Sequence, residues 1–436
     1  MAAASHSLAA WSRPRAVVSR IVIFGAAATV ATGLAIRHLH GGLGTATPPF
    51  VMVWGPRLDP LAAVSALVVA AGIALAPRLP RRPPAFAAGA LALALGLGLG
   101  INLARSGAAG WYAVFDLGPG GSFEAANEYL PGLPALSYGP RFYLDRFAEL
   151  VPSLPVNVAG HPPGPLLVLH GLGISTAAGA AALCIAAGAL GAPLTYALGR
   201  SLLDERDARV AALLFACSPL TLLFGVTSFD YLFATCGLVS ACLLFCDRRA
   251  ARAAGALALA AASLMSWALL AVGAWATIVI YRRRGARAAV VLAASCAAAW
   301  LALDGALAAA FGYDPIGALR ATEAVYRHSV ATVRPYPFWA FGAPVAWGAM
   351  LGLPIAAAAL RSAARGDDAA VALAIVIAIA AIGGFSKAET ERIWLFLVPL
   401  ACIAAAPAIR GRRLPGVVAL LLVQALAVEV LFDTIW

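Results

Sequence analysis

Long apolar runs alternate with short polar segments along the whole chain. Each run approaches the roughly 20 residues that an α-helix needs to cross the hydrocarbon core of a bilayer. We therefore predict helical spans at residues 21–36, 61–76, 85–103, 176–198, 211–226, 231–245, 288–311, 338–360, 369–382, 393–408 and 417–432. This pattern is typical of an all-α polytopic membrane protein, with about 11–13 transmembrane helices once a further hairpin is counted.

The further hairpin is predicted from the arginine clusters that flank residues 253–281. Lys and Arg accumulate in cytoplasmic loops, so each cluster marks the inner side of the membrane. This segment follows Arg252 and precedes Arg282, and it therefore begins and ends on the same side. One helix cannot do so, and we expect a tight hairpin or a re-entrant pair of helices.

The same rule sets the orientation of the chain. Arg13, Arg15 and Arg20 precede the first span, which predicts a cytoplasmic N-terminus. Alternation of the spans then places every segment rich in mixed polar chemistry outside. These segments are residues 106–160, the turn at Asp230, residues 312–337 and residues 386–392. Such one-sidedness is what an enzyme working at the outer membrane surface would show.

Composition supports the membrane interpretation and excludes others. Hydrophobic residues make up 62% of the chain and charged residues 12%, with a mean hydropathy of +0.88. Soluble domains carry about 25% charged residues. The net charge of +11 lies in clusters between spans and not along a groove, which argues against a nucleic-acid partner. We expect one transmembrane domain over residues 1–436, with N-terminal spans (1–104), an extracytoplasmic acidic loop with juxtamembrane helices (105–163), and the remaining helices with outer loops 312–337 and 384–392 (164–436).

The basic residues are nearly all arginine, and Lys387 is the only lysine. Together with the abundance of alanine, this indicates a GC-rich bacterial genome and hence a bacterial plasma membrane. The seven cysteines lie in apolar stretches without a CxxC pair, so they resemble small hydrophobic residues and no zinc or disulfide framework is predicted.

The first outer segment gathers acids in a chain that is otherwise poor in them. Polar residues are expensive in a membrane protein and tend to be functional. Glu124 and Glu128 are spaced i, i+4 and would share one face of a helix. A carboxylate facing a sugar or phosphate site could act as a general base. Glu128, Glu124 and Asp116 are therefore the candidate catalytic residues, and the alternative is a solvated juxtamembrane helix.

The segment 312–337 carries arginines on the predicted outer side, against the usual bias. A guanidinium matches the oxygens of a phosphate, which gives these arginines a reason to be there. Ion pairing with Asp314 and Glu323 is the alternative. The candidate substrate-binding residues of this segment are Arg320, Arg327, His328 and Arg334.

Two further segments supply candidate binding residues. Lys387, Glu391 and Arg392 open a late span, where Lys387 or Arg392 would contact a lipid phosphate or anchor in the headgroup layer. His161 stands at the entry to another membrane segment, where it would donate to a phosphate or lie among the headgroups.

Together these features resemble the GT-C superfamily of integral membrane glycosyltransferases, which use polyprenyl-phosphate sugars as donors. The likeness rests on the acidic loop ending in His161-Pro162-Pro163, on Asp230 in Ser228-Phe229-Asp230-Tyr231, on the hairpin 253–281, and on Glu391-Arg392-Ile393-Trp394. His-Pro-Pro is similar to protein O-mannosyltransferase-like members. The chain departs from the family because its acidic loop follows the third predicted helix instead of the first, and because it has no Asp-Glu or Asp-x-Asp pair.

The resemblance implies an inverting mannosyl- or arabinosyltransferase-like enzyme with its active site outside. A first-loop carboxylate would be the base, and Lys387, Arg392 and one of Arg320, Arg327 or Arg334 would hold the donor phosphate. The expected partners are a polyprenyl-phosphate sugar, a glycan, lipid or protein acceptor, and membrane lipids. No cofactor is required by this scheme, and a divalent cation stays open because none of the acids has convincing spacing. A transporter or lipid flippase, and an inert membrane partner protein, are the alternatives.

Overall fold

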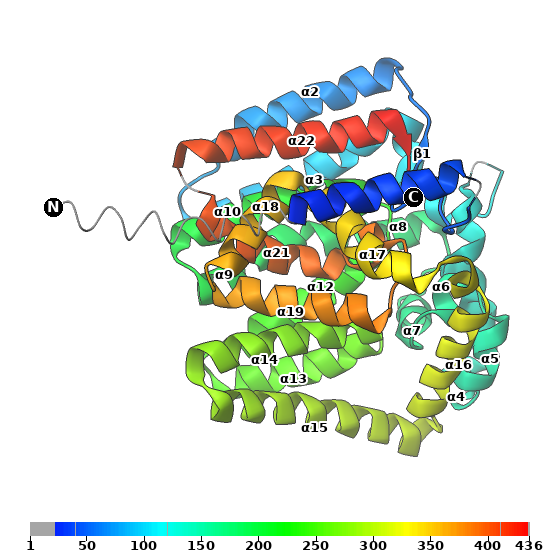
Figure 1. Ribbon diagram of the computed structural model, residues 1–436. Coiled ribbons are helices and arrows are strands. Elements are labelled where there is room, and N and C mark those ends of the chain that lie inside the picture. The colour runs from blue at the N-terminus through cyan, green and yellow to red at the C-terminus, as the bar shows by residue number, and fades with distance from the viewer. Residues whose placement is uncertain (1–21, 40, 120, 410, 435–436) are drawn as a thin grey trace.

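The computed structural model describes residues 22–39, 41–119, 121–409 and 411–434. In this part of the chain nearly all regular structure is helical, and many helices run side by side, roughly from left to right in Figure 1. The predicted cytoplasmic markers Arg13, Arg15 and Arg20, with Arg410, lie outside the described residues. The prediction of an all-α fold is confirmed. Among the described residues, one small antiparallel ribbon pairs β1 (Val53–Trp54) with β2 (Phe432–Asp433).

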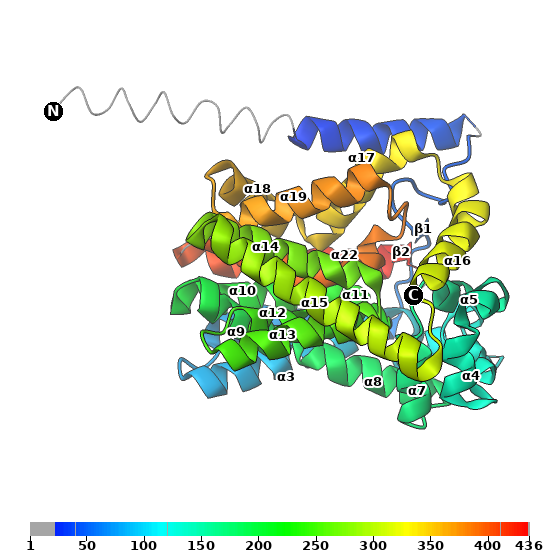
Figure 2. The same ribbon diagram turned by 90° about the horizontal axis from the view of Figure 1, so that it is seen from below.

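The N-terminal spans form where the apolar runs predicted them. The helix Val22–His38 lies along one edge of the bundle beside α17 (Tyr336–Leu351), as Figure 2 shows. Next come α2 (Pro60–Leu75), the short η1 (Ala76–Arg78) and α3 (Pro83–Ser106). Gly100 lets α2 and α3 approach closely, because a Cβ there would lie 2.6 Å from Val68 Cγ1. Small residues at such contacts are the usual means of packing membrane helices.

Residues 107–163 fold into a compact array of short helices, not an open loop. The elements are η2 (Gly107–Trp111), η3 (Ala113–Phe115), η4 (Phe123–Asn127), η5 (Leu130–Leu136), α4 (Gly139–Asp145), α5 (Phe147–Leu150), η6 (Val151–Ser153) and α6 (Val156–Ala159). Proline occupies the first turn of several of them, where its missing N–H costs nothing. This array and α16 (Pro315–His328) gather at one end of the bundle in Figure 1, which we call the loop end.

The central helices build most of the bundle. They are α7 (Gly164–Gly171), α8 (Ala177–Ala189), α9 (Gly191–Leu202), α10 (Glu205–Cys217), α11 (Pro219–Leu223), α12 (Asp230–Leu244), α13 (Arg249–Ser263), η7 (Trp267–Leu269), α14 (Leu270–Arg284) and α15 (Ala286–Phe311). The span predicted at 211–226 is broken between α10 and α11, because Pro219 cannot continue the backbone hydrogen bonding of α10.

The predicted hairpin at 253–281 is confirmed. The helices α13 and α14 are separated by a short break, and Arg284 at the end of α14 lies 3.8 Å from Asp247, just before α13. The two helices are therefore antiparallel. Arg283 also donates to the carbonyl of Leu202 at the end of α9 (3.0 Å). These contacts join three helix junctions at the opposite end of the bundle, which we call the arginine end.

The C-terminal half contains η8 (Val330–Val333), α17, α18 (Leu353–Ala364), α19 (Asp368–Gly383), α20 (Thr390–Ile393), η9 (Leu395–Leu397), α21 (Val398–Ala405), η10 (Ala406–Ala408), η11 (Gly411–Arg413) and α22 (Leu414–Leu431). The prediction of one helix over 338–360 is wrong, because α17 and α18 meet at an angle of 115°. Gly352 forms the corner with φ of 110°, a backbone conformation that favours glycine. Gln424 of α22 accepts from Leu353 N (3.2 Å) and donates to Ala349 O (2.7 Å), so backbone groups freed by the break keep partners.

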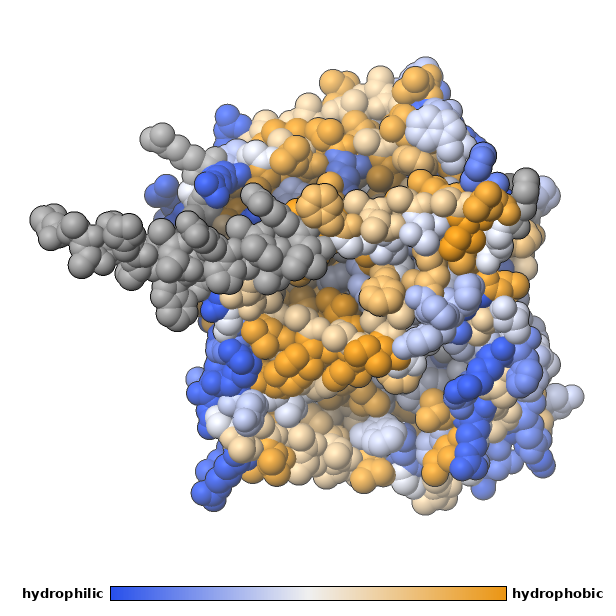
Figure 3. All heavy atoms as spheres, viewed as in Figure 1, coloured by the Kyte–Doolittle hydropathy of each residue, from blue (hydrophilic) through white to orange (hydrophobic). Residues whose placement is uncertain are grey.

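The protein is a polytopic membrane helical bundle. By length and apolarity, five described helices are able to cross a membrane, and up to six if the bent α17–α18 pair counts as one span. The five are Pro60–Arg78, Pro83–Phe115, Ala177–Leu202, Ala286–Phe311 and Leu414–Leu431. Several other predicted spans are shorter apolar helices, including Asp230–Leu244 and Asp368–Gly383. Figure 3 shows hydrophilic residues gathered at both ends and an apolar belt between them.

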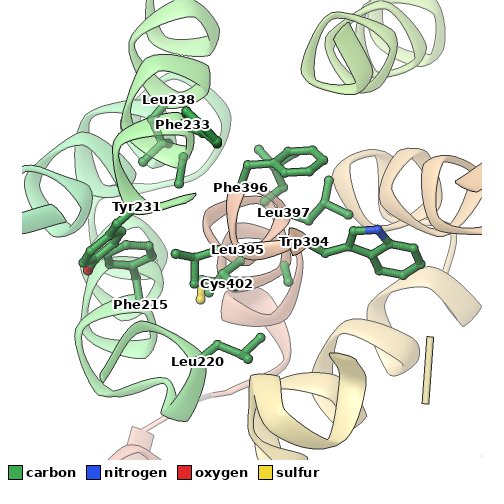
Figure 4. Close-up of a cluster of buried hydrophobic side chains, with 14 of the residues drawn as sticks. Phe215, Leu220, Tyr231, Phe233, Leu238, Trp394, Leu395, Phe396, Leu397 and Cys402 are labelled. Carbon is green, nitrogen blue, oxygen red and sulfur yellow. The ribbon is translucent and has the colours of Figure 1, made fainter. Parts of the chain in front are cut away.

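The core fixes the segment that follows Arg392. Figure 4 shows Phe215 of α10, Tyr231 of α12, Leu395 and Cys402 converging in one buried cluster. Trp347 donates from Nε1 to the carbonyl oxygen of Trp394 at 3.1 Å, which ties α17 to the same segment. The start of α21 is therefore held rigidly from several sides.

Candidate functional site

Three segments that are distant in sequence meet in one buried polar group at the loop end. The residues come from the array 107–163, from the start of α12, and from the segment before α21. We call this group the Arg392 cluster, and its members are Glu128, Asn157, Asp230, Glu389 and Arg392.

Arg392 is the centre of the cluster. Its Nη1 donates to Asp230 Oδ2 at 2.7 Å, and its Nη2 donates to Glu389 Oε2 at 3.3 Å and to Asn157 Oδ1 at 3.5 Å. The Arg392 side chain is 3% exposed and that of Asp230 is 5% exposed. A planar guanidinium presents several donors in fixed directions, so one residue links all three segments.

A strained turn presents Glu389 and Arg392 to the cluster. Ala388 and Glu389 have φ of 63° and 56°, the left-handed region that non-glycine residues rarely adopt. Thr390 Oγ1 donates to Ala343 O at 2.8 Å, which fastens α20 to α17. Strained residues of this kind persist only where the surroundings hold them, and they concentrate at functional sites.

Asp230 is fixed by its own helix. It is the first residue of α12, where a negative charge is favourable beside the unpaired N–H groups. Ser228 Oγ donates to Asp230 Oδ2 at 2.8 Å and accepts from Asp230 N at 3.1 Å. The carboxylate thus faces Arg392 in one orientation.

Glu128 is completely buried, yet one of its oxygens is available. Asn157 Nδ2 donates to Glu128 Oε1 at 2.8 Å, whereas Oε2 is buried without a hydrogen-bond partner among the described residues. Burial raises the pKa of Glu128 from 4.5 to about 8, although the positive charge of Arg392 opposes this rise. A carboxyl group that titrates near neutral pH and has a vacant oxygen can accept a proton from a ligand.

His161 and aromatic rings form the wall beside Glu128. His161 Nδ1 lies 2.7 Å from the carbonyl oxygen of Asn157, so Nδ1 carries the hydrogen. The hydroxyl of Tyr129 lies 3.3 Å from the same nitrogen, and the His161 ring packs 5.1 Å from Phe233. Burial lowers the pKa of His161, so its imidazole is neutral and Nε2 is a hydrogen-bond acceptor.

A second group of ionisable residues adjoins the Arg392 cluster. Arg334 forms an ion pair with Glu389 and donates to the carbonyl oxygen of Lys387 at 2.8 Å. Burial acts to raise the pKa of Glu389, but Arg334 and Arg392 together hold it below its ordinary value. Glu389 is therefore an anion shared between two guanidinium groups.

Glu391 links this second group to the N-terminal part of the chain. Its Oε1 accepts from Val51 N at 2.9 Å, and its Oε2 is buried without a partner in the described structure. Burial raises the pKa of Glu391 to about 7. The segment before α2 therefore contributes a wall that the sequence does not predict.

The structure brings together only part of the predicted site. Around the cluster it places Glu128, His161, Asp230, Arg334, Lys387, Glu391 and Arg392. It leaves others elsewhere: Asp116 accepts from Gly118 N, Glu124 accepts from Asn127, Arg327 pairs with Glu323, and His328 lies against Ala324 of its own helix. Arg320 is exposed on α16.

The expected shared helical face of Glu124 and Glu128 is wrong. Glu124 belongs to the 3-10 helix η4, and Glu128 follows it in an extended conformation with φ of −78° and ψ of −171°. Only Glu128 is completely buried in the cluster. Glu124 is half-buried and accepts from Asn127, and besides burial its charge contributes to the raised pKa of Glu128.

Sequence reasoning missed Asn157, Ser228 and Glu389. Asn157 stands four positions before His161, and Glu389 lies two positions before Glu391, so both were next to predicted residues. The available signal was a polar side chain in an otherwise apolar context, which in a membrane protein needs a partner.

Among the residues that the structure describes, no group of three or more His, Cys, Asp and Glu side chains could hold a metal ion. Searches against protein-family models and against curated protein sequences found no match for this chain.

Proposed function

We propose that the protein is a membrane glycosyltransferase that uses a polyprenyl-phosphate sugar as donor and works on the extracytoplasmic side. The acceptor is a cell-envelope glycan, lipid or protein, and the transferred group is a hexose or a pentose. The observation that carries the proposal is the buried carboxyl of Glu128, with one vacant oxygen, beside a positively charged centre at the loop end. That pairing suits a proton acceptor next to an anionic leaving group.

Glu128 is the base in this proposal. The acceptor hydroxyl gives its proton to Glu128 Oε2, and its oxygen forms a bond to the anomeric carbon of the donor sugar. The bond between that carbon and the phosphate oxygen breaks, and polyprenyl phosphate leaves with the electron pair. Attack opposite to the leaving group inverts the anomeric configuration.

Lys387 is the residue best suited to meet the phosphate. Arg392 already engages three protein oxygens, and Arg334 is paired with Glu389. Among the described residues no carboxylate pairs with the ammonium group of Lys387, which is partly exposed. In this scheme Arg392 holds the cluster and supplies positive potential, whereas Lys387 contacts the leaving group directly.

A proton-coupled transporter or flippase is the second candidate. A buried carboxyl that titrates near pH 8 could carry a proton across part of the membrane in a transport cycle. The two candidates differ in what happens to the donor, because a transferase consumes it and a transporter moves it unchanged.

The test uses purified protein in liposomes with a panel of labelled polyprenyl-phosphate sugars. Wild type should release polyprenyl phosphate, and Glu128→Gln should lower turnover by a factor on the order of 10²–10⁴. Glu124→Gln and Asp116→Asn are the matched controls and should retain turnover. Full turnover by Glu128→Gln would exclude Glu128 as base. Movement of an intact donor across the bilayer without its consumption would favour the transporter.

A further inference from the structure

A second feature lies at the arginine end, away from the Arg392 cluster. A cavity of about 410 Å³ opens where the end of α9, the junction of α12 with α13, and the end of α14 meet. Its wall includes three arginines, Arg200, Arg283 and Arg284, and one carboxylate, Asp247. None of these residues takes part in the proposed transfer reaction.

The charges of the three arginines are only partly balanced. Arg200 pairs with Glu205, which also accepts from Arg209 at 2.6 Å. Arg283 shares Asp368 with Arg282, at 3.4 Å and 2.9 Å respectively. These pairs place two carboxylates against four guanidinium groups. The end of the bundle around the cavity therefore carries an excess of positive charge.

Arg284 has the longest ion pair of these arginines. Its nearest carboxylate is Asp247 at 3.8 Å, and the Asp247 side chain is 96% exposed. An ion pair with such an exposed partner contributes little, so the guanidinium is available to an incoming anion. Guanidinium groups match phosphate oxygens in geometry as well as in charge.

The rest of the cavity wall is mixed, with the polar Ser201 beside three apolar side chains. Ile280 belongs to the end of α14, and Phe245 and Cys246 directly follow the last residue of α12. Figure 3 shows that hydrophilic residues at this end give way directly to that belt. The cationic cavity thus lies at the polar edge of the apolar belt, where it can take a phosphate headgroup while the chains of the same amphiphile lie on the belt.

We propose that this cavity binds the phosphate headgroup of an anionic membrane lipid, with the lipid chains lying along the adjacent apolar surface. Arg284 and Arg200 contact the phosphate, and Arg283 shapes the floor through its bond to Leu202. The site is separate from the proposed catalytic centre, so it stands whether or not the protein transfers sugars.

The test is native mass spectrometry of the full-length protein released from detergent micelles. Phosphatidylglycerol, phosphatidylcholine and inorganic phosphate are added separately. Wild type should retain phosphatidylglycerol in preference to phosphatidylcholine. Arg284→Gln should weaken phosphatidylglycerol binding about fivefold, the factor that corresponds to roughly 1 kcal/mol for one basic residue at a membrane surface.

Two further variants keep the result interpretable. Arg81→Gln is the matched control: Arg81 is exposed, its carbonyl is near Arg209 at the same end, and it does not line the cavity. It should bind phosphatidylglycerol as wild type does. Asp247→Asn removes the competing carboxylate at a fully exposed position and should strengthen binding.

Several outcomes would overturn the proposal. Equal retention of phosphatidylglycerol and phosphatidylcholine would remove the role of net negative charge. An equal loss of phosphatidylglycerol binding in Arg284→Gln and Arg81→Gln would show that only the net charge of the protein matters. Displacement of phosphatidylglycerol by inorganic phosphate at similar concentration would identify the ligand as a soluble anion and not a lipid.

Discussion

Replacing Arg392 by glutamine should destabilise the protein by about 3–5 kcal/mol, the range for breaking a buried ion pair by removing one partner. Arg392 Nη1 lies 2.7 Å from Asp230, and Nη2 also reaches Glu389 and Asn157. Without the guanidinium, Ser228 is the one side-chain donor left to Asp230 among the described residues, and the charge of Asp230 stays buried. The array 107–163 and α12 thereby lose their hydrogen bonds to α20.

Two related variants test how much of this loss of stability comes from charge and how much from the geometry of the guanidinium. Arg392→Lys keeps the charge but presents one ammonium in place of a planar fork, so we expect about half of the loss seen with glutamine. A double-mutant cycle with Asp230→Asn should give a coupling of about 1–3 kcal/mol, because the two side chains are in direct contact and nearly fully buried.

The assay is reversible unfolding in mixed micelles with increasing denaturing detergent, followed by tryptophan fluorescence. Trp394 and Trp347 are buried and contact each other, so they report on this region. Arg327→Gln is the matched control, because its pair with Glu323 is exposed and should contribute less than about 1 kcal/mol. If Arg392→Gln is no less stable than Arg327→Gln, the cluster does not hold the three segments together.

Two further predictions concern Glu128. In Asn157→Leu, Glu128 Oε1 loses the 2.8 Å donor that favours its ionised form, so its pKa should rise above about 8. Infrared spectroscopy of the protonated carboxyl, with the band assigned by its loss in Glu128→Gln, measures this, and an unchanged titration would contradict it. Because the folded-state pKa is raised from 4.5 to about 8, the stability that the bound proton contributes is complete at low pH. It should fall by about 1.4 kcal/mol per pH unit between these values. Glu128→Gln lacks this titrating group, so its free energy of unfolding should not show this fall. The difference between wild type and variant should therefore shift in favour of the variant as pH rises through this range, and parallel pH profiles would refute the raised pKa.

The positions of the long helices were determined by the sequence alone. The predicted spans at 61–76, 85–103, 288–311 and 417–432 differ from α2, α3, α15 and α22 by only a few residues at each end. A helix in lipid satisfies its own backbone hydrogen bonds, so an apolar run of sufficient length specifies it without reference to the rest of the fold. The arginine clusters likewise predicted the α13–α14 hairpin, because charge placement relative to the membrane is a local property of each connection.

The break between α17 and α18 depended on a tertiary contact. Gly352 turns the chain by 115° between α17 and α18, and the freed backbone groups are satisfied by Gln424 of α22. Residues 338–360 contain no signal for that partner, since it lies 71 positions from Leu353. An apolar composition alone therefore favoured one continuous helix.

The residues of the candidate site were likewise determined partly by sequence and partly by tertiary structure. Local chemistry was sufficient to select Glu128, Asp230, Arg334 and Arg392 as candidates, because a charged residue beside a membrane span needs a reason. Only the tertiary structure separated Glu128 from Glu124 and Asp116, and only it joined Asn157 to Arg392 across 235 positions of sequence. The physical reason is that hydrogen bonds and buried charges are pairwise, so the role of each polar residue is decided by the partner that folding brings to it.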